Sequence, residues 1–214
     1  MNFDELVNIL MKVNWIQICQ AVAALWMALV ATKALNTWKR QIKANQHIEF
    51  LDELTDTVHS YILLISDSVS SIKFAHLFID SYPEILIEDR DIENKKLVFF
   101  IEKEGKSTYE RIQNQLEPVT PVLTKMRSLV AKGQVLGIVD YDKCHDACKM
   151  LEWSYNQITA FASIVGSTSL NWEHPKVQQA LSDIKTVNST TIENNLTKQN
   201  SEFLKFVKKA YDHI

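Results

Sequence analysis

Glycine and proline are absent from the whole stretch between Met1 and Tyr82. These two residues interrupt helices most often, because glycine adds backbone freedom and proline lacks an N–H group. The chain of 214 residues holds only 4 glycines and 4 prolines, too few for many short strands joined by tight turns. The sequence therefore predicts an all-α protein of long helices, the first of which meets no helix breaker before Pro83.

The first part of this helix is apolar enough to cross a membrane. From Trp15 to Lys33 only two glutamines, Thr32 and Lys33 itself are polar. About 20 residues that rise 1.5 Å each match a hydrocarbon core of about 30 Å. Trp15 and Trp38 bracket the segment, as indoles do at the two membrane interfaces. We expect one transmembrane helix over residues 15–38; the alternative is a buried helix of a soluble domain.

The charges on the two sides of the apolar run predict its orientation. Residues 1–14, expected to form an amphipathic segment, hold Lys12 against two acidic residues, whereas four basic residues follow the run. Positive flanks stay in the cytoplasm. We therefore expect a single-pass protein of the bacterial inner membrane, with the lipid bilayer as a partner and residues 39–214 as a cytoplasmic helical domain. The residues expected at the membrane interface are Trp15, Trp38, Lys39, Arg40 and Lys43.

Small and polar residues recur at spacings of three and four along the apolar run. They are Gln17, Gln20, Ala21, Ala24, Ala28 and Ala31. Transmembrane helices associate through such stripes, because lipid supplies no hydrophobic drive between helices. A glutamine that faces lipid is costly, so it is better placed against another helix or a water-filled lumen. Since a single-span chain has no second membrane helix, this stripe predicts a homo-oligomer.

Residues 39–214 carry the pattern of a helical bundle. Apolar residues recur every three or four positions from Ile48 to Ile72, the inward stripe of a long amphipathic helix. The serines of residues 66–71 offer capping alternatives that could interrupt it. The run KLVFFI, residues 96–101, is expected to be helical because no second strand is present to pair with it. Further helices are expected over residues 91–117, 122–133, 141–165, 175–187 and 190–214.

Several single residues mark the expected boundaries of these helices. Gly105 is expected to divide residues 91–117 into two helices, Gly133 to end the next helix, and Asp140 to cap the helix after it. The last helix is expected to close the bundle with its apolar side, and a contact of its lysines with anionic lipid is the alternative. Three aromatic residues, Trp153, Tyr155 and Phe161, are expected in the core.

Composition and motifs exclude several classes of function. A net charge of −3 differs from the basic excess of dedicated nucleic-acid binders. The chain contains no Gly-rich phosphate loop, no nucleophile elbow and no His-Glu-x-x-His motif. Cys144 and Cys148 lie one helical turn apart, but a zinc site needs four ligands that converge from two elements. We expect buried, reduced thiols there, and neither a metal nor a cofactor.

The pair Arg40 and His47 carries a resemblance to a known family. Seven residues make nearly two helical turns, so both side chains project from one face of a helix. In a helical bundle this pair resembles the Arg-x(4–6)-His signature of HEPN domains. The resemblance implies a dimeric ribonuclease without metal, in which His47 moves a proton and Arg40 stabilises phosphate charge.

The layout of one amino-terminal span and a small helical body also resembles the membrane accessory protein of type VI, RNA-targeting CRISPR systems. That resemblance implies a membrane-embedded ring that acts in antiviral defence, with a pore lined by the polar face of the span. The sequence does not identify the trigger, for which RNA and a protein are both open. Three functions therefore stay open: a self-assembled, non-enzymatic membrane effector, a membrane-tethered HEPN-type ribonuclease, and a membrane scaffold for a protein partner.

Overall fold

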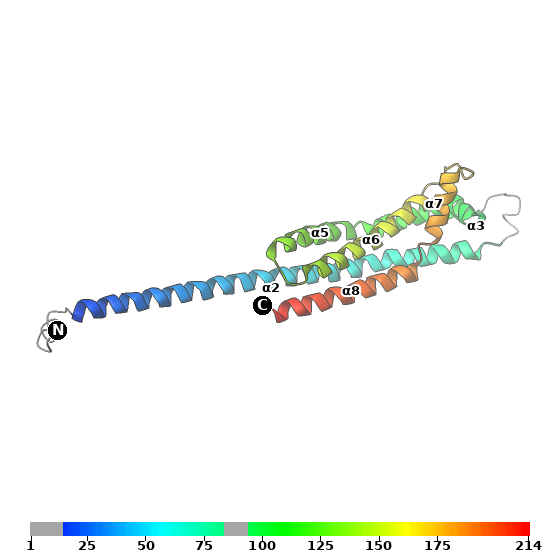
Figure 1. Cartoon of the computed structure of the whole chain (residues 1–214). Helices are drawn as coiled ribbons and strands as arrows, with labels where there is room; N and C mark the ends of the chain where they lie inside the picture. Colours follow the sequence, from blue (N-terminus) through cyan, green and yellow to red (C-terminus); the bar gives the residue numbers. More distant parts are fainter. Residues whose placement is uncertain (1–14, 84–93) are drawn as a thin grey trace, which may run out of the picture. The chain divides into compact units, whose positions relative to one another are not determined.

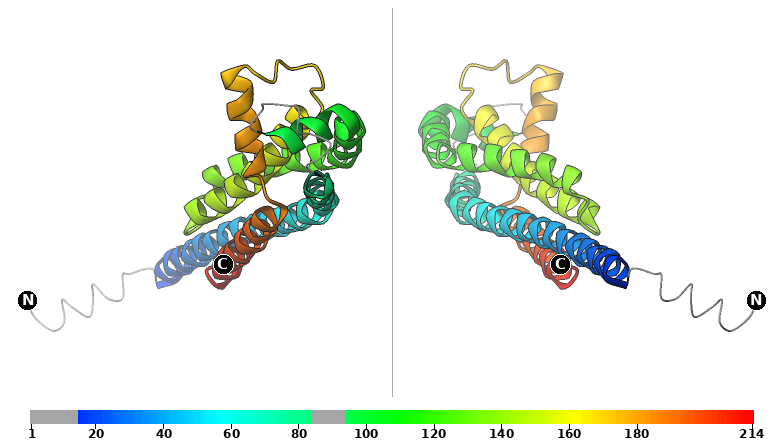
Figure 2. Two further views of the ribbon diagram at one scale, coloured as in Figure 1. Left: turned by 90° about the vertical axis from the view of Figure 1, so that its right-hand side faces the viewer. Right: turned by 90° about the vertical axis from the view of Figure 1, so that its left-hand side faces the viewer.

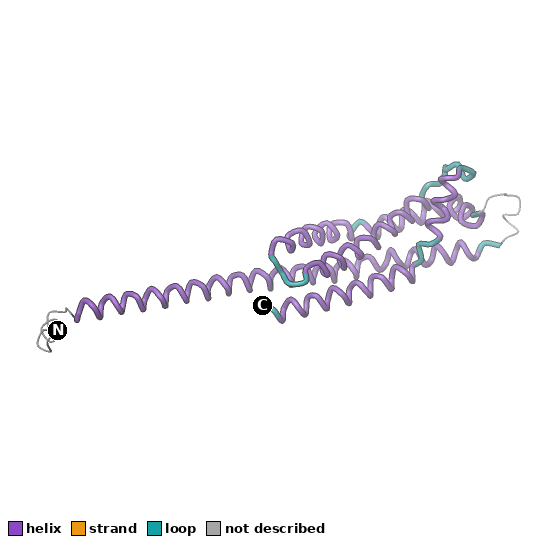
Figure 3. Tube along the Cα trace, viewed as in Figure 1, coloured by secondary structure: helices purple, strands orange, loops and turns teal. Residues whose placement is uncertain are grey.

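The computed structural model describes residues 15–83 and 94–214, and these two ranges contain helices and links but no strand (Figure 3). The predicted all-α class is confirmed. The predicted amphipathic segment, residues 1–14, lies outside the described residues, as do residues 84–93. The chain divides into two compact units, residues 1–46 and residues 47–214, and each is described by itself.

Helix α2 runs from Trp15 to Ser81 without interruption. Of the four serines in residues 66–71, Ser66 and Ser70 bond to their own helix. Ser71 Oγ instead donates to Gln115 Oε1 at 2.8 Å, and the buried Ser68 Oγ has no hydrogen-bond partner among the described residues. Ser66 Oγ donates to the carbonyl of Ile62 at 2.8 Å, and Ser70 Oγ donates to the carbonyl of Ser66 at 3.1 Å. Because these hydroxyls bond one turn back, they do not compete for the N–H groups that hold the helix together.

The unit of residues 47–214 is a bundle built on the later part of α2. Its other elements are α3 (Lys95–Phe100), a π-helical turn (Ile101–Gly105), α4 (Lys106–Leu116), α5 (Val119–Leu136), α6 (Tyr141–Val165), α7 (Pro175–Lys185) and α8 (Ser189–Asp212). Within this unit α5 and α6 form an antiparallel hairpin, α8 lies alongside α2, and α7 runs across the long helices (Figures 1 and 2). The link between α5 and α6 and the end of α8 lie at the same end of the bundle (Figure 1).

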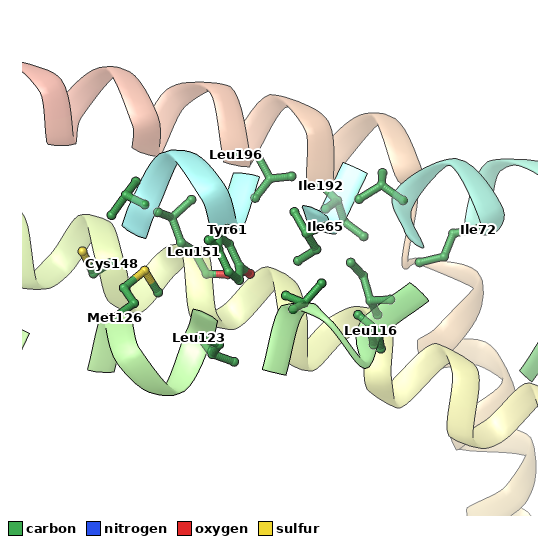
Figure 4. Packing of buried hydrophobic residues seen from close by; sticks show 14 of the residues in the cluster. Tyr61, Ile65, Ile72, Leu116, Leu123, Met126, Cys148, Leu151, Ile192 and Leu196 are labelled. Atoms are coloured by element: carbon green, nitrogen blue, oxygen red, sulfur yellow. The ribbon is translucent and has the colours of Figure 1, made fainter. Parts of the chain in front are cut away.

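The core of this bundle lies between α2, α5, α6 and α8 (Figure 4). Most of the predicted stripe of α2 is buried there: Leu51, Leu54, Val58, Ile65, Val69 and Ile72. Tyr61 is fully buried beside them, and its hydroxyl donates to the carbonyl of Leu151 at 2.7 Å. Burial raises the pKa of the Tyr61 phenol, so this hydroxyl stays a neutral donor. The predicted amphipathic character of α2 is confirmed, although Ile48 is exposed and Ile62 is half-buried.

One predicted boundary is wrong, and one predicted cap residue stands at the expected position without a capping hydrogen bond. Gly133 does not end α5, which continues to Leu136 and stops at Gly137, where φ is 66°. Gly133 instead gives room to the Tyr141 ring, because a Cβ atom there would lie 2.2 Å from the Tyr141 hydroxyl oxygen. Asp140 stands at the amino-terminal cap position of α6 but its side chain makes no capping hydrogen bond. Its carboxylate accepts from Lys143 at 3.1 Å and from Lys209 at 2.6 Å instead.

Two further expectations need revision. Gly105 does not break the chain between α3 and α4, since its backbone is helical (φ −59°, ψ −44°) and ends a π-helical turn. The sequence KLVFFI is helical as predicted. Trp153 is not a core residue: its side chain is 54% exposed and lines a cavity of about 390 Å³ beside α7, whereas Phe161 is fully buried.

Candidate functional site

The candidate site is the apolar stretch of α2, residues 15–38. No charged residue occurs between Trp15 and Thr32, and no side chain of residues 15–46 is buried. Among the described residues α2 is the one helix that is long and apolar enough to cross a membrane. Its bulky exposed side chains include Val22, Leu25, Trp26, Leu29 and Val30. A core helix of a soluble protein can have the same composition but is mostly buried, whereas no residue of this stretch is buried.

The stretch has two chemically different faces. A helix turns about 100° per residue, and at that pitch the six small and polar positions fall within an arc of about 100°. These positions are Gln17, Gln20, Ala21, Ala24, Ala28 and Ala31, and all six are exposed. The bulky side chains occupy the opposite side. The face of small and polar residues is therefore narrow and smooth, and it carries two amides. We call these six residues the seam.

The hydroxyls of the stretch are already satisfied within α2. Thr32 Oγ1 donates to the carbonyl of Ala28 at 2.8 Å, and Thr37 Oγ1 donates to the carbonyl of Lys33 at 3.0 Å. A polar group can enter an apolar solvent at low cost when its hydrogen bond is internal. Between Trp15 and Val30, the amides of Gln17 and Gln20 and the indole N–H of Trp26 are the groups that would need a hydrogen-bond partner in such a solvent.

The residues predicted at the membrane interface are exposed as well. Trp15 and Trp38 expose 57% and 58% of their surfaces. The three cations that follow, Lys39, Arg40 and Lys43, are exposed and form no ion pair with another described residue. Indoles and free cations at the end of an apolar run are the groups that interact with lipid headgroups.

His47 has a structural contact that the sequence did not show. Its Nε2 lies 3.2 Å from the carbonyl oxygen of Leu136, the last residue of α5. A carbonyl only accepts, so Nε2 carries the proton and donates. The carbonyls of the last turn of a helix lack helical partners, and His47 therefore caps α5. Nε2 of His76 likewise lies 2.9 Å from a carbonyl oxygen, that of Val187, in the link between α7 and α8.

Arg40 and His47 differ in their surroundings. Arg40 belongs to the unit of residues 1–46 and is exposed, whereas His47 belongs to the unit of residues 47–214 and is half-buried. The ribonuclease interpretation of this pair stays a prediction. It requires His47 to exchange a proton with RNA, while the hydrogen bond to Leu136 already engages Nε2 and leaves Nδ1 for that task.

Replacing His47 by alanine separates these two roles. We expect His47→Ala to lower the free energy of unfolding by about 1 kcal/mol, because the carbonyl of Leu136 loses its donor. Urea unfolding followed by circular dichroism measures this change, with exposed His59→Ala as the matched control. If RNA cleavage by the full chain disappears while stability is unchanged, His47 is catalytic and its capping role is refuted.

The cysteine pair of α6 has the chemistry of buried thiols. Cys144 and Cys148 are both buried, as predicted. A hydrogen bond with Cys144, together with burial, raises the pKa of Cys148, so its reactive thiolate form is disfavoured. The described residues contain no group of three or more histidine, cysteine, aspartate or glutamate side chains placed to hold a metal ion.

Comparison with known proteins gives no assignment. No protein-family model matches the chain, and neither the curated proteins nor the solved structures yield a similar protein.

Proposed function

We propose that this chain is a single-pass protein of the bacterial inner membrane that assembles with copies of itself through residues 15–38. The observation that carries the proposal is the exposure of every side chain in an uncharged stretch as long as a bilayer is thick. The basic cluster after Trp38 supports a cytoplasmic position for the bundle of residues 47–214.

The seam of residues 17–31 supports self-assembly. The amides of Gln17 and Gln20 need hydrogen-bond partners in lipid, and no other described helix is long and apolar enough to supply them within the membrane. The alanines on the same face permit close approach of two backbones. A second copy supplies both the amide partners and the complementary smooth surface.

In an assembly of more than two copies, part of this seam faces the central axis. A ring would then surround a lumen bordered by glutamine side chains, which are hydrogen-bonding groups suited to contact with water. We therefore propose a pore-like or membrane-perturbing effector of antiviral defence, in agreement with the layout of the type VI accessory proteins. The cytoplasmic bundle is the part that would receive an RNA or protein trigger.

The size of the detergent-solubilised particle tests the assembly. We expect Ala24→Leu to shift the particle from an oligomer toward one chain per particle, because the larger side chain holds the two seams apart. Ala23→Leu is the matched control: it adds the same side chain one position away, outside the seam, and is expected to leave the size unchanged. Static light scattering coupled to size exclusion measures both.

If Ala24→Leu and the unmodified chain form particles of equal size, the seam does not mediate the assembly. If the unmodified chain forms particles of one chain each, self-assembly is contradicted and residues 15–38 act only as a membrane tether.

A further inference from the structure

A cavity of about 390 Å³ lies between α6 and the end of α7. From α6 it is lined by four residues between Trp153 and Ala160, which recur at spacings of three and four and therefore share one helix face. Its other wall is the last turn of α7 and the start of the link to α8, from Asp183 to Val187. All lining residues belong to the unit of residues 47–214. A volume near the lower end of the range for ligand sites suits one side chain or a small molecule.

Trp153 presents an unoccupied aromatic surface to this cavity. It is 54% exposed, although tryptophan is highly buried on average. None of the ring pairs of the described chain includes Trp153, and the cation that lies over a ring is Lys103, on Phe99. The face of an indole carries the negative part of its quadrupole and attracts cations more strongly than other aromatic side chains do.

The polar groups of the cavity include acceptors that suit the same kind of ligand. Asp183 is the only charged residue among those that line it. Gln179 Nε2 donates to Asp183 Oδ1 at 2.8 Å, which leaves Oδ2 without a hydrogen bond from another described residue. Neither amide of Asn156 and Gln157 forms a hydrogen bond with another described residue, so their oxygens can accept as well.

Two lysines lie near the cavity but do not line it. Lys149 lines a separate cavity between α5 and α6, and Lys185 is exposed. Among the described ion pairs, none joins either lysine to Asp183. The carboxyl end of α7 adds partial negative charge beside the cavity. The attraction for a cation therefore comes from close contact with the lining groups and not from a long-range field.

This combination of groups favours a guanidinium. A guanidinium is flat and weakly hydrated, so it stacks on an indole while its N–H groups reach carboxylate and amide oxygens. The methylene stem of an arginine suits the apolar wall formed by Ile184 and Val187. A phosphate would meet no cation among the lining residues, so a nucleotide would find partners only for its base.

We propose that this cavity binds an arginine side chain of a partner protein, with the guanidinium stacked on Trp153 and hydrogen-bonded to Asp183. Of the RNA and protein triggers left open above, the cavity favours a protein. Its role as a trigger site rests on the proposed function, whereas the binding itself requires only the bundle. An arginine seated there covers the exposed indole and bridges α6 to the end of α7.

Fluorine NMR of the full chain in detergent tests the site. The protein is produced with fluorotryptophan, so that each of its five tryptophans reports separately, and Trp153→Phe identifies the signal of residue 153 by its loss. The probe is N-acetyl-arginine amide, titrated to millimolar concentrations because a single side chain binds weakly. N-acetyl-citrulline amide, which has nearly the same shape without the charge, is the matched control.

We expect the arginine compound to shift the signal of residue 153 saturably and to leave the other tryptophan signals in place, and the citrulline compound to shift none. Asp183→Asn keeps the shape of the side chain but removes its charge, and is expected to raise the dissociation constant about tenfold. Asp67→Asn, at an exposed carboxylate of α2, is the matched control and is expected to leave it unchanged.

Equal shifts with the arginine and citrulline compounds, or an unchanged dissociation constant in Asp183→Asn, would overturn the proposal. A saturable shift with guanosine but not with the arginine compound would also overturn it and assign the cavity to a nucleobase. Either result leaves the membrane assembly standing, because particle size tests that assembly separately.

Discussion

Replacing Leu25 and Leu29 together by arginine is expected to release the chain from the membrane. An arginine near the centre of a spanning helix costs about 3 kcal/mol, so the pair costs about 6 kcal/mol, roughly a 10⁴-fold change in partitioning. Both leucines are exposed, by 66% and 67%, so neither substitution disturbs a packed core. Flotation of cell membranes in a density gradient measures the change, since aggregated protein does not float with lipid.

Helix α2 provides its own control for this experiment. Leu63 and Leu77 lie in the same helix and are almost equally exposed, by 61% and 58%. Their replacement by arginine adds the same charges to the bundle unit, and membrane flotation is expected to be unchanged. Should the Leu25/Leu29 double variant float as the unmodified chain does, residues 15–38 do not span a bilayer, and the proposal on assembly within the membrane loses its basis.

Local patterns in the sequence predicted most of the secondary structure. The absence of glycine and proline before Pro83 indicated one long helix, and α2 is that helix. The three-and-four spacing predicted the buried stripe from Leu51 to Ile72, because burial of one helix face is a local consequence of periodicity. Phe203 and Phe206 of α8 are buried in the bundle, in agreement with the predicted closing helix.

Tertiary contacts decided the features that local patterns could not predict. The sequence does not show whether a glycine ends a helix or permits a close packing contact. Gly133 permits a close contact with the Tyr141 ring. His47 and His76 bond to carbonyls 89 and 111 residues away, so no spacing rule could find them. Val135 near the end of α5 and Val139 in the link to α6 are exposed, although they belong to an apolar run that would ordinarily indicate burial.

The Arg40/His47 spacing illustrates the same limit for the site. Seven residues on one helix place two side chains on one face, which is all that the pattern can establish. The pattern does not reveal that the His47 ring is engaged by the end of α5. The exposed seam of residues 17–31 was easier to predict, because it depends on residue size and polarity within a single helix.

A close backbone approach at Gly105 predicts a loss of stability. A Cβ atom on Gly105 would lie 2.3 Å from the carbonyl oxygen of Val165, the last residue of α6. Gly105→Ala therefore forces α4 and α6 apart by roughly 1 Å, and such overpacking costs about 1–3 kcal/mol or more. The gain in helix propensity from glycine to alanine returns about 1 kcal/mol. Because the obstacle is backbone and cannot change rotamer, we expect a net loss of about 2 kcal/mol, with a melting temperature lower by about 4–8 °C.

Gly137→Ala is the informative comparison for Gly105→Ala, since the two glycines are needed for different reasons. No atom lies within 4 Å of a Cβ at Gly137, whose φ of 66° is the whole obstacle. Its replacement is expected to cost about 1 kcal/mol through backbone strain. Differential scanning calorimetry of both variants measures which of them is less stable. A Gly105→Ala protein as stable as the unmodified chain would contradict the close approach of α4 to the end of α6, and with it the reason why the π-helical turn of residues 101–105 ends in glycine.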